Sequence, residues 1–458
     1  MTDGLILRFP ATVKPVFARY LFAVLERLCY FQNLAKARIH EANYDAATEA
    51  LLECIHLSPQ QDWAFTDLAA IYALRGKSTS AYLLFKRAVL LNPANAVALK
   101  DLGVLAADNG RHSLGTGFYR QSLRFAPGVA DTRIKLAKSL LHQGDYPNGW
   151  TEYEARLDPC CIKTCLHAIP RLPRWDGSHC VAGEPLIIIS EQGIGDTFQF
   201  MRYVRIFADK LHSAPVVFCV RDDLLEISSR VLSGISVIGV SRLSLVKRGL
   251  WQPLLSIPGI LGVSPSNPIC LPPYIEADST RVAHWRRLIK AGKRVVVGIH
   301  WQGDPSHEHG DHKGRSIALD CFKILSCVDQ VVLVSLQKGY GSERLAGCQF
   351  LRQFISCQHL VSASHEWDDT AAIMSLCDLI ITNDTSVAHL SGAMGVQTWL
   401  LLKKFAEWRW SGEQESTFWY PSMRLFRQQI GGDWFGVMGH VATELQGFIR
   451  ARLSNERA

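Results

Sequence analysis

The chain has 458 residues, 48% of them hydrophobic and 20% charged, which is the composition of a globular protein of two or three domains and excludes a mainly disordered chain. The net charge is +7, but the basic residues are scattered, so the sequence does not indicate a nucleic-acid partner. Thirteen irregularly spaced cysteines and no visible secretory signal lead us to expect a reduced, cytoplasmic protein.

Residues 1–30 are expected to form a capping region ahead of the rest of the chain. Their apolar stretch, residues 16–31, is interrupted by Arg19, Glu26 and Arg27. A membrane span needs about 20 mostly apolar residues. We therefore predict an amphipathic helix here and no transmembrane segment.

Residues 31–160 carry a repeat of 34 residues, marked by prolines and glycines in register: Pro59, Pro93, Pro127, Gly76, Gly110 and Gly144. This period is typical of the tetratricopeptide helix–turn–helix repeat. The glycines are expected to adopt positive φ between the two helices of a pair, and the prolines to end the second helix. Small residues such as Ala69 and Ala81 allow the paired helices to approach closely. The pattern predicts a tetratricopeptide α-solenoid.

The remainder alternates between buried strands and helices, which predicts parallel βαβ units. After a linker at 161–183, we expect one α/β half at 184–275 and a second at 276–458. The predicted strands are Leu186–Ile189, Val216–Val220, Arg294–His300, Val331–Leu336, Leu379–Thr382 and Thr398–Leu402. The proline-rich start of residues 241–291 predicts irregular structure, and Thr280–Ala291 is expected to be helical. Ligands of such sheets bind at the carboxyl ends of the strands.

Four polar motifs follow these strands. The first is the turn Gly193-Ile194-Gly195-Asp196, which is not a dinucleotide fingerprint because Phe198 occupies the third glycine position. A glycine-rich turn at a helix N-terminus suits an anion or a sugar. Asp196 is equally well interpreted as the cap of that helix.

The second motif places Lys313 and Arg315 beyond a strand, where they could clamp a diphosphate or lie on the surface. The third places Gln337 and Lys338 directly after another strand.

The fourth motif runs from Thr382 to His389 and includes Asp384, Thr385 and Ser386. Here a strand leads into a helix N-terminus that carries hydroxyl groups, which is a natural phosphate site. His389 lies four residues past Thr385, so both share one helix face. The alternative is structural, with Asp384 as a cap and His389 as a packed histidine.

Several segments in the same order carry a family resemblance: Pro173–Gly177, Glu191–Thr197, Trp301–Gly303, Arg315–Ile317, Ser335–Gly339, Asn383–Leu390, Trp408–Trp410 and Trp419–Ser422. Residues 170–440 resemble the glycosyltransferase module of bacterial tetratricopeptide proteins, which is heptosyltransferase-like and of the GT-B type. The resemblance implies a pair of Rossmann-type α/β domains after the solenoid. It also implies Asp196 as the catalytic base, and a diphosphate bound by Asp384, Thr385 and His389 with Lys313 or Arg315.

The sequence therefore predicts an α plus α/β protein that moves a sugar from a nucleotide-sugar donor to a protein or glycan acceptor recruited by the repeats. The donor site would comprise Gly193, Gly195, Lys313, Arg315, Gln337, Lys338, Asp384, Thr385, Ser386 and His389. We expect no cofactor and no metal, because no Asp-x-Asp occurs. The alternative is a non-catalytic tetratricopeptide adaptor with a degenerate module. We also expect a fragment beginning near Ile169 to retain donor binding.

Overall fold

A computed structural model of the protein describes residues 14–178, 183–211, 214–308, 310–364 and 366–455. The chain divides into two compact units between Leu136 and Ala137. Residues 1–13 of the predicted capping region and residues 179–182 of the predicted linker lie outside the described part of the chain. No helix in the part that is described is long and apolar enough to cross a membrane.

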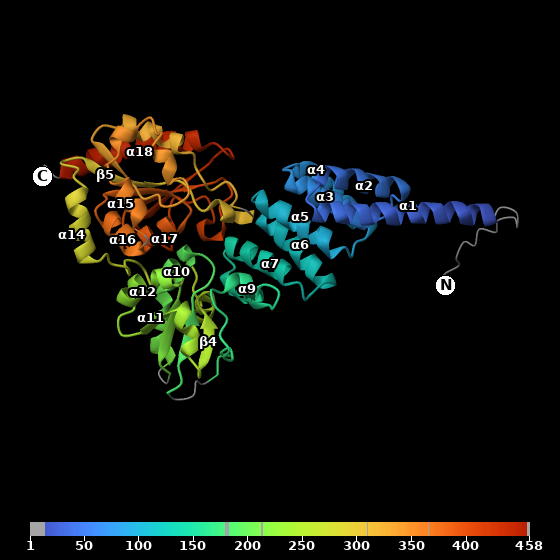
Figure 1. The fold of residues 1–458 in the computed structure, drawn as a ribbon, viewed down its shortest axis with the longest axis horizontal. Helices are drawn as coiled ribbons and strands as arrows, with labels where there is room; N and C mark the ends of the chain where they lie inside the picture. Colours follow the sequence, from blue (N-terminus) through green and yellow to red (C-terminus); the bar gives the residue numbers. More distant parts are fainter. Residues whose placement is uncertain (1–13, 179–182, 212–213, 309, 365, 456–458) are drawn as a thin grey trace. The chain divides into compact units, whose positions relative to one another are not determined.

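The first unit is built from pairs of antiparallel helices, shown in blue to cyan in Figure 1. Its helices are α1 (Lys14–His40), α2 (Tyr44–Leu57), α3 (Asp62–Leu74), α4 (Ser78–Leu91), α5 (Ala96–Asp108), α6 (His112–Phe125) and the start of α7 (Ala130–His142). Helices α3, α5 and α7 begin at residues 62, 96 and 130, and α2, α4 and α6 at residues 44, 78 and 112. Both series advance by 34 residues, so the predicted tetratricopeptide-type repeat is confirmed.

The turn chemistry also follows the prediction. Gly76, Gly110 and Gly144 have φ of +73°, +75° and +85°, which glycine adopts without steric cost. In the first pair, Ala42 takes the corresponding position at φ +55°. Helices α2, α4 and α6 each end two residues before one of the repeat prolines, which were predicted to end them. One boundary differs: α1 runs without a break across residue 30, so the expected cap and the first repeat share one helix.

The second unit begins within α7, includes α8 (Tyr146–Tyr153) and continues into two parallel sheets. The first sheet has the order β3-β2-β1-β4, with β1 (Leu186–Ile189) between β2 (Val216–Val220) and β4 (Leu250–Pro253), and β3 (Ser236–Gly239) at the edge. Its connecting helices are α10 (Ile194–Phe200), α11 (Arg202–Leu211), α12 (Leu225–Val231) and α13 (Ile257–Leu261). Strands β3 and β4 lie where the sequence showed no strand pattern.

The second sheet has the order β6-β5-β7-β8-β9, and all neighbouring strands are parallel. Its strands are β5 (Val295–His300), β6 (Val331–Ser335), β7 (Leu379–Asn383), β8 (Thr398–Leu402) and β9 (Met423–Arg427). Its helices are α14 (Ser279–Leu288), α15 (Gln358–Ala363), α16 (Trp367–Ser375), α17 (Ser386–Ala393) and α18 (Trp434–Asn455). The predicted order of helical repeats followed by a parallel α/β region is confirmed.

Residues expected to be a linker are instead part of the core of the first sheet. The short helix α9 (Ile162–Cys165) leads into Leu166, which is buried against Ile187 and Trp251. The last repeat helix, α8 (Tyr146–Tyr153), also belongs to this unit. Its Trp150 is buried and donates a hydrogen bond from Nε1 to the Val263 carbonyl at 2.9 Å. The α/β module therefore begins well before Ile169.

This arrangement predicts the minimal folded fragment. A fragment of residues 130–458 keeps α7 and α8 and should unfold cooperatively. A fragment of residues 169–458 lacks Trp150 and Arg156, and it leaves the fully buried carboxylate of Glu191 without its cation. Breaking one buried ion pair costs about 3–5 kcal/mol. Circular dichroism melting should show the shorter fragment unfolded or melting at least 10 °C lower, on the order expected for that loss. Equal melting temperatures would contradict the assignment.

Candidate functional site

The candidate site lies at the carboxyl edge of the second sheet, where the loops after β5, β7 and β8 meet α10 of the first α/β half. Parallel strands all end at the same edge, so polar residues that follow different strands are brought together there. Helices α10 and α17 pack against each other across this edge. The two predicted motifs around Asp196 and Asp384 are therefore neighbours.

Arg409 joins the two halves at this point. Its buried guanidinium, in the loop after β8, pairs with Oδ1 of Asp196 and donates from Nε to Oε1 of Gln199 at 2.6 Å. Its Nη1 binds both carboxylate oxygens of Glu407, at 2.8 and 2.9 Å. The guanidinium also lies over the ring of Trp408, 4.4 Å from the centroid. Each nitrogen of this cation thus contacts a protein group.

Asp196 makes two contacts of different kinds. Its Oδ2 accepts a hydrogen bond from the Gly193 amide at 2.8 Å, which closes the first turn of α10. Its Oδ1 faces Arg409 in the other half. The capping interpretation and the functional one are therefore compatible, because one carboxylate oxygen caps the helix while the other points into the site.

Two further carboxylates lie close to Arg409, and both are harder to ionise than usual. Burial raises the pKa of Glu407 to about 7, although Arg409 opposes the shift and the charge of Asp384 adds to it. Burial also raises the pKa of the Asp384 carboxyl, against the charge of Arg315. A carboxyl group that titrates near neutral pH can take up and release a proton under working conditions.

The N-terminus of α17 carries no side-chain cap. Its first residue follows Thr385, which is extended. Arg315 reaches the same place and donates from Nη1 to the Asp384 carbonyl at 3.3 Å. The Nε of Arg315 is buried and has no hydrogen-bond partner among the described residues. An uncapped helix N-terminus beside a cation with a free donor is suited to phosphate oxygens.

His300, at the end of β5, supports this turn. Its Nδ1 lies 2.9 Å from Oδ1 of Asn383 and 3.3 Å from Oγ1 of Thr385. Burial lowers the pKa of His300 to about 4. The imidazole is therefore neutral at pH 7 and fixes the strand-to-helix turn through hydrogen bonds.

His389 and Gly195 face each other where α17 meets α10. His389 stacks on Trp410, and its Nδ1 lies 3.0 Å from the Tyr420 hydroxyl. Burial, with the charges of Arg409 and Arg202, holds the pKa of His389 well below its usual range. A Cβ at Gly195 would lie 2.7 Å from the His389 ring, so the glycine is required for this close packing. His389 is available to a ligand only as a neutral group.

The remaining predicted residues differ in their freedom to bind a ligand. The amide of Gln337 is fully used, since it accepts from the Trp301 and Gln302 amides and donates to the carbonyls of Gln302 and Tyr340. This side chain fixes two loops. Lys338 donates to the Glu366 carbonyl at 3.1 Å, and burial lowers its pKa to about 8.

Lys313 and Ser386 complete the set. Lys313 is exposed, whereas Arg315, in the same loop after β5, is half-buried and reaches the Asp384 carbonyl after β7. Between the two basic candidates, the geometry favours Arg315 for a contact with phosphate. Ser386 is the first residue of α17 and lies against Gly195.

The sequence did not single out Glu407 as a functional residue, and it assigned no role to Arg409 or Gln199. The segment Trp408-Arg409-Trp410 did carry part of the family resemblance, and it follows a predicted strand. Its position after a strand was therefore the signal in the sequence that could have identified Arg409 and Glu407 as site residues. In the described part of the chain, no group of three or more His, Cys, Asp or Glu side chains is arranged to hold a metal ion.

Comparison with known proteins gives limited further information. No family model matches the chain. Protein FlbA of Caulobacter vibrioides (strain ATCC 19089 / CIP 103742 / CB 15) is 24% identical over 469 residues, covering 96% of this chain and 76% of FlbA. MamA from Desulfovibrio magneticus RS-1 matches 30% of this chain and 78% of its own, with 16% identity and a TM-score of 0.28.

YrrB, a TPR protein with an unusual peptide-binding site, matches 28% of this chain and 68% of its own, with 14% identity and a TM-score of 0.26. At such scores, these structures add nothing to what the helix pairs and their 34-residue spacing already show.

The buried imidazole of His300 predicts an acid-sensitive fold. Its pKa is about 4 in the folded state and about 6.5 in an unfolded chain, so the unfolded chain binds the proton first as the pH falls. Between pH 7 and pH 5 this one group should lower the free energy of unfolding by about 2 kcal/mol. His300→Asn should remove that part of the pH dependence, as measured by urea unfolding at both pH values. His440→Asn, at an exposed site, is the control and should keep it. Equal slopes for both variants would contradict the prediction.

Proposed function

We propose that the protein is a glycosyltransferase, which moves a sugar from a nucleotide-sugar donor to an acceptor recruited by the helical repeats. The observation that carries the proposal is the combination of the uncapped N-terminus of α17 with Arg315 and its free Nε at one sheet edge. A diphosphate supplies oxygens that would accept hydrogen bonds from both. The resemblance of residues 170–440 to the heptosyltransferase-like module supports the same assignment.

In this proposal the donor lies against the second α/β half. Its diphosphate is held by Arg315 and the first amides of α17, with the Thr385 hydroxyl alongside. These groups stabilise the negative charge that grows on the diphosphate as it leaves. The hydrogen bond between His300 and Asn383 keeps the turn rigid. The N–H groups that bind the diphosphate are therefore already aligned when it arrives.

Transfer also requires a base. The acceptor hydroxyl gives its proton to a carboxylate while its oxygen bonds to the anomeric carbon, and the sugar–phosphate bond breaks with its electron pair leaving on the diphosphate. Asp196 is the base that the family resemblance implies. Both of its oxygens are occupied in this structure, so the acceptor would have to displace Arg409 from Oδ1. Glu407, with its pKa near 7, is the second carboxylate suited to the role.

The helical repeats are proposed to select the acceptor. Stacked helix pairs create an extended concave surface that suits a peptide or another protein.

The competing function is a non-catalytic adaptor. It is favoured by the same ion pair, because Arg409 neutralises Asp196 and α10 is packed tightly on α17.

The phosphate assignment predicts a specific loss of binding. Arg315→Met should weaken the binding of a nucleoside diphosphate by about 10- to 150-fold, the equivalent of losing a charged hydrogen bond of about 1.5–3 kcal/mol. Isothermal titration calorimetry with uridine, guanosine, adenosine and cytidine diphosphates measures this loss. Lys313→Met removes an exposed charge two residues away and should leave affinity within threefold. If both variants bind as the parent does, the site is not at Arg315.

The base assignment predicts different effects for two variants. Asp196→Asn and Glu407→Gln each keep side-chain shape and remove the carboxylate. The variant that lacks the base should transfer sugar about 10²–10⁴-fold more slowly while its donor affinity persists. The other should lose less than tenfold. Rates come from transfer or donor hydrolysis followed by diphosphate release. Parent rates in both variants would exclude both carboxylates as the base.

A further inference from the structure

The turn that carries Asp196 contains a backbone conformation that its own sequence does not favour. Gln192 has φ +59°, in the left-handed region. For a residue with a side chain, this conformation costs about 1–3 kcal/mol and persists only where the surroundings enforce it. Glycine follows immediately, at position 193, so the chain places the unusual conformation on a glutamine beside a residue that would adopt it freely.

The polar groups of Gln192 are bound by residues 153–167, which the sequence assigned to the end of the repeats and a linker. Its amide donates to the Cys165 carbonyl at 2.7 Å, and its carbonyl accepts from Nε2 of His167 at 2.8 Å. Its side-chain Nε2 and Oε1 lie 2.9 and 3.1 Å from the Tyr153 hydroxyl. Three separate contacts therefore hold one strained residue.

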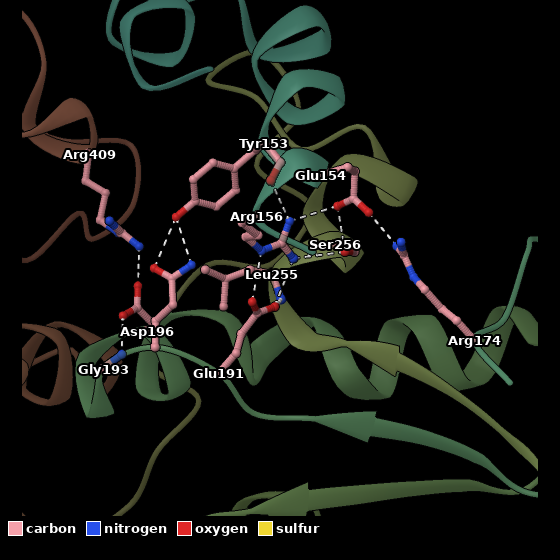
Figure 2. Close-up of polar contacts among 11 residues, drawn as sticks. Tyr153, Glu154, Arg156, Arg174, Glu191, Gly193, Asp196, Leu255, Ser256 and Arg409 are labelled. Carbon is pink, nitrogen blue, oxygen red and sulfur yellow. Dashed lines mark hydrogen bonds and ion pairs between the residues drawn. The ribbon is translucent and has the colours of Figure 1, made fainter. Parts of the chain in front are cut away.

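The preceding residue is held from the same segment. Glu191 is fully buried and accepts two hydrogen bonds from Arg156, from Nε and Nη2, each at 2.9 Å. The Leu255 amide donates to the same carboxylate at 2.8 Å. Arg156 is also bound by Glu154, which in turn pairs with Arg174 (Figure 2). The turn is thus fixed by the last helix pair on one side and by the first sheet on the other.

These contacts lead directly to Asp196. Gln192 precedes Gly193, whose amide donates to Oδ2 of Asp196, and Oδ1 of Asp196 meets Arg409 (Figure 2). A change in the backbone at Gln192 therefore moves the Gly193 amide and with it the carboxylate. The ring of Tyr153 packs against Trp150 and lies beneath the Arg156 guanidinium, and these contacts fix the position of its hydroxyl.

We propose that Tyr153 is a positioning residue for Asp196: its hydroxyl holds Gln192 in the left-handed conformation that aims the Asp196 carboxylate at the site. The last helix of the repeats is then part of the site itself, beyond any role in recruiting an acceptor. Arg156 supports the same turn through Glu191. Any consequence for catalysis rests on the proposed function, whereas the effect on the turn does not.

The first test is independent of activity. Hydrogen–deuterium exchange of the full chain, read on peptides spanning residues 190–200, should be at least tenfold faster in Tyr153→Phe than in the parent. Tyr203→Phe is the matched control, since it removes a buried tyrosine hydroxyl that contacts the Pro268 carbonyl instead. Exchange of residues 190–200 should be unchanged there. The same exchange rate in both variants would overturn the proposal.

A second pair of variants tests the strain directly and replaces the first if Tyr153→Phe does not fold. Gln192→Gly and Gln192→Ala both lose the contact with Tyr153, but only glycine adopts the left-handed conformation freely. The alanine variant should exchange at least fivefold faster than the glycine variant over residues 190–200. In the glycine variant, adding Tyr153→Phe should change exchange less than twofold. Equal exchange in the alanine and glycine variants would overturn the proposal.

Activity then separates this proposal from the proposed function. Tyr153→Phe should lower kcat for sugar transfer at least tenfold and leave KM for the donor within twofold, because Asp196 does not hold the donor. Gln192→Gly should restore part of that rate in the Tyr153→Phe background. If the parent protein transfers no sugar, the glycosyltransferase assignment fails, and the exchange result still decides whether Tyr153 positions the turn.

Discussion

The buried cation of Arg409 is the interaction on which the site depends. An unpaired guanidinium in the interior is too costly to persist, so Arg409 requires carboxylates around it. One of them, Asp196, comes from α10 in the first α/β half, and the other, Glu407, from its own loop. The same demand for charge compensation therefore brings the two halves together and places a candidate base at their junction.

A second buried cation, Arg156, has the same effect at the start of the α/β unit. It needs Glu191 and Glu154, and by binding them it makes the last repeat helix part of the first sheet. Together with the buried Trp150 of α8, which donates to the Val263 carbonyl, this ion pair joins the end of the repeat pattern to the second compact unit. The repeat period describes how helices stack, but it does not show which helix packs on the α/β sheets.

Burial also changes what the predicted residues can do. His300 and His389 are neutral at pH 7 because the interior penalises the imidazolium ion, so positive charge at this edge comes from arginines. Gln337 has every hydrogen-bonding group occupied, and it serves the loops around the site. In these places the motifs predicted which residue types lie at the sheet edge, while the surrounding structure determined their charge and their free hydrogen-bonding groups.

The sequence alone determined the features that depend on local pattern. The 34-residue period, the positive φ of the turn glycines and six of the strands follow from nearby residues. The loops after β5 and β7 are brought together by the rule that parallel strands of one sheet end at the same edge, whereas Asp196 follows β1 of the other sheet. Strands β3, β4 and β9 were not predicted because their apolar pattern is weak. Strand β3 is partly exposed at the sheet edge, β4 ends in Pro253, and β9 contains two arginines among its apolar residues.

Only the tertiary structure decided which charges meet. Arg409 and Asp196 are 213 residues apart, and Arg156 and Glu191 are 35 apart, so no local pattern links either pair. The left-handed conformation of Gln192 is likewise imposed by Tyr153, Cys165 and His167 across space. Periodicity is a property of neighbours in the chain, whereas charge compensation and strain depend on what folding brings into contact.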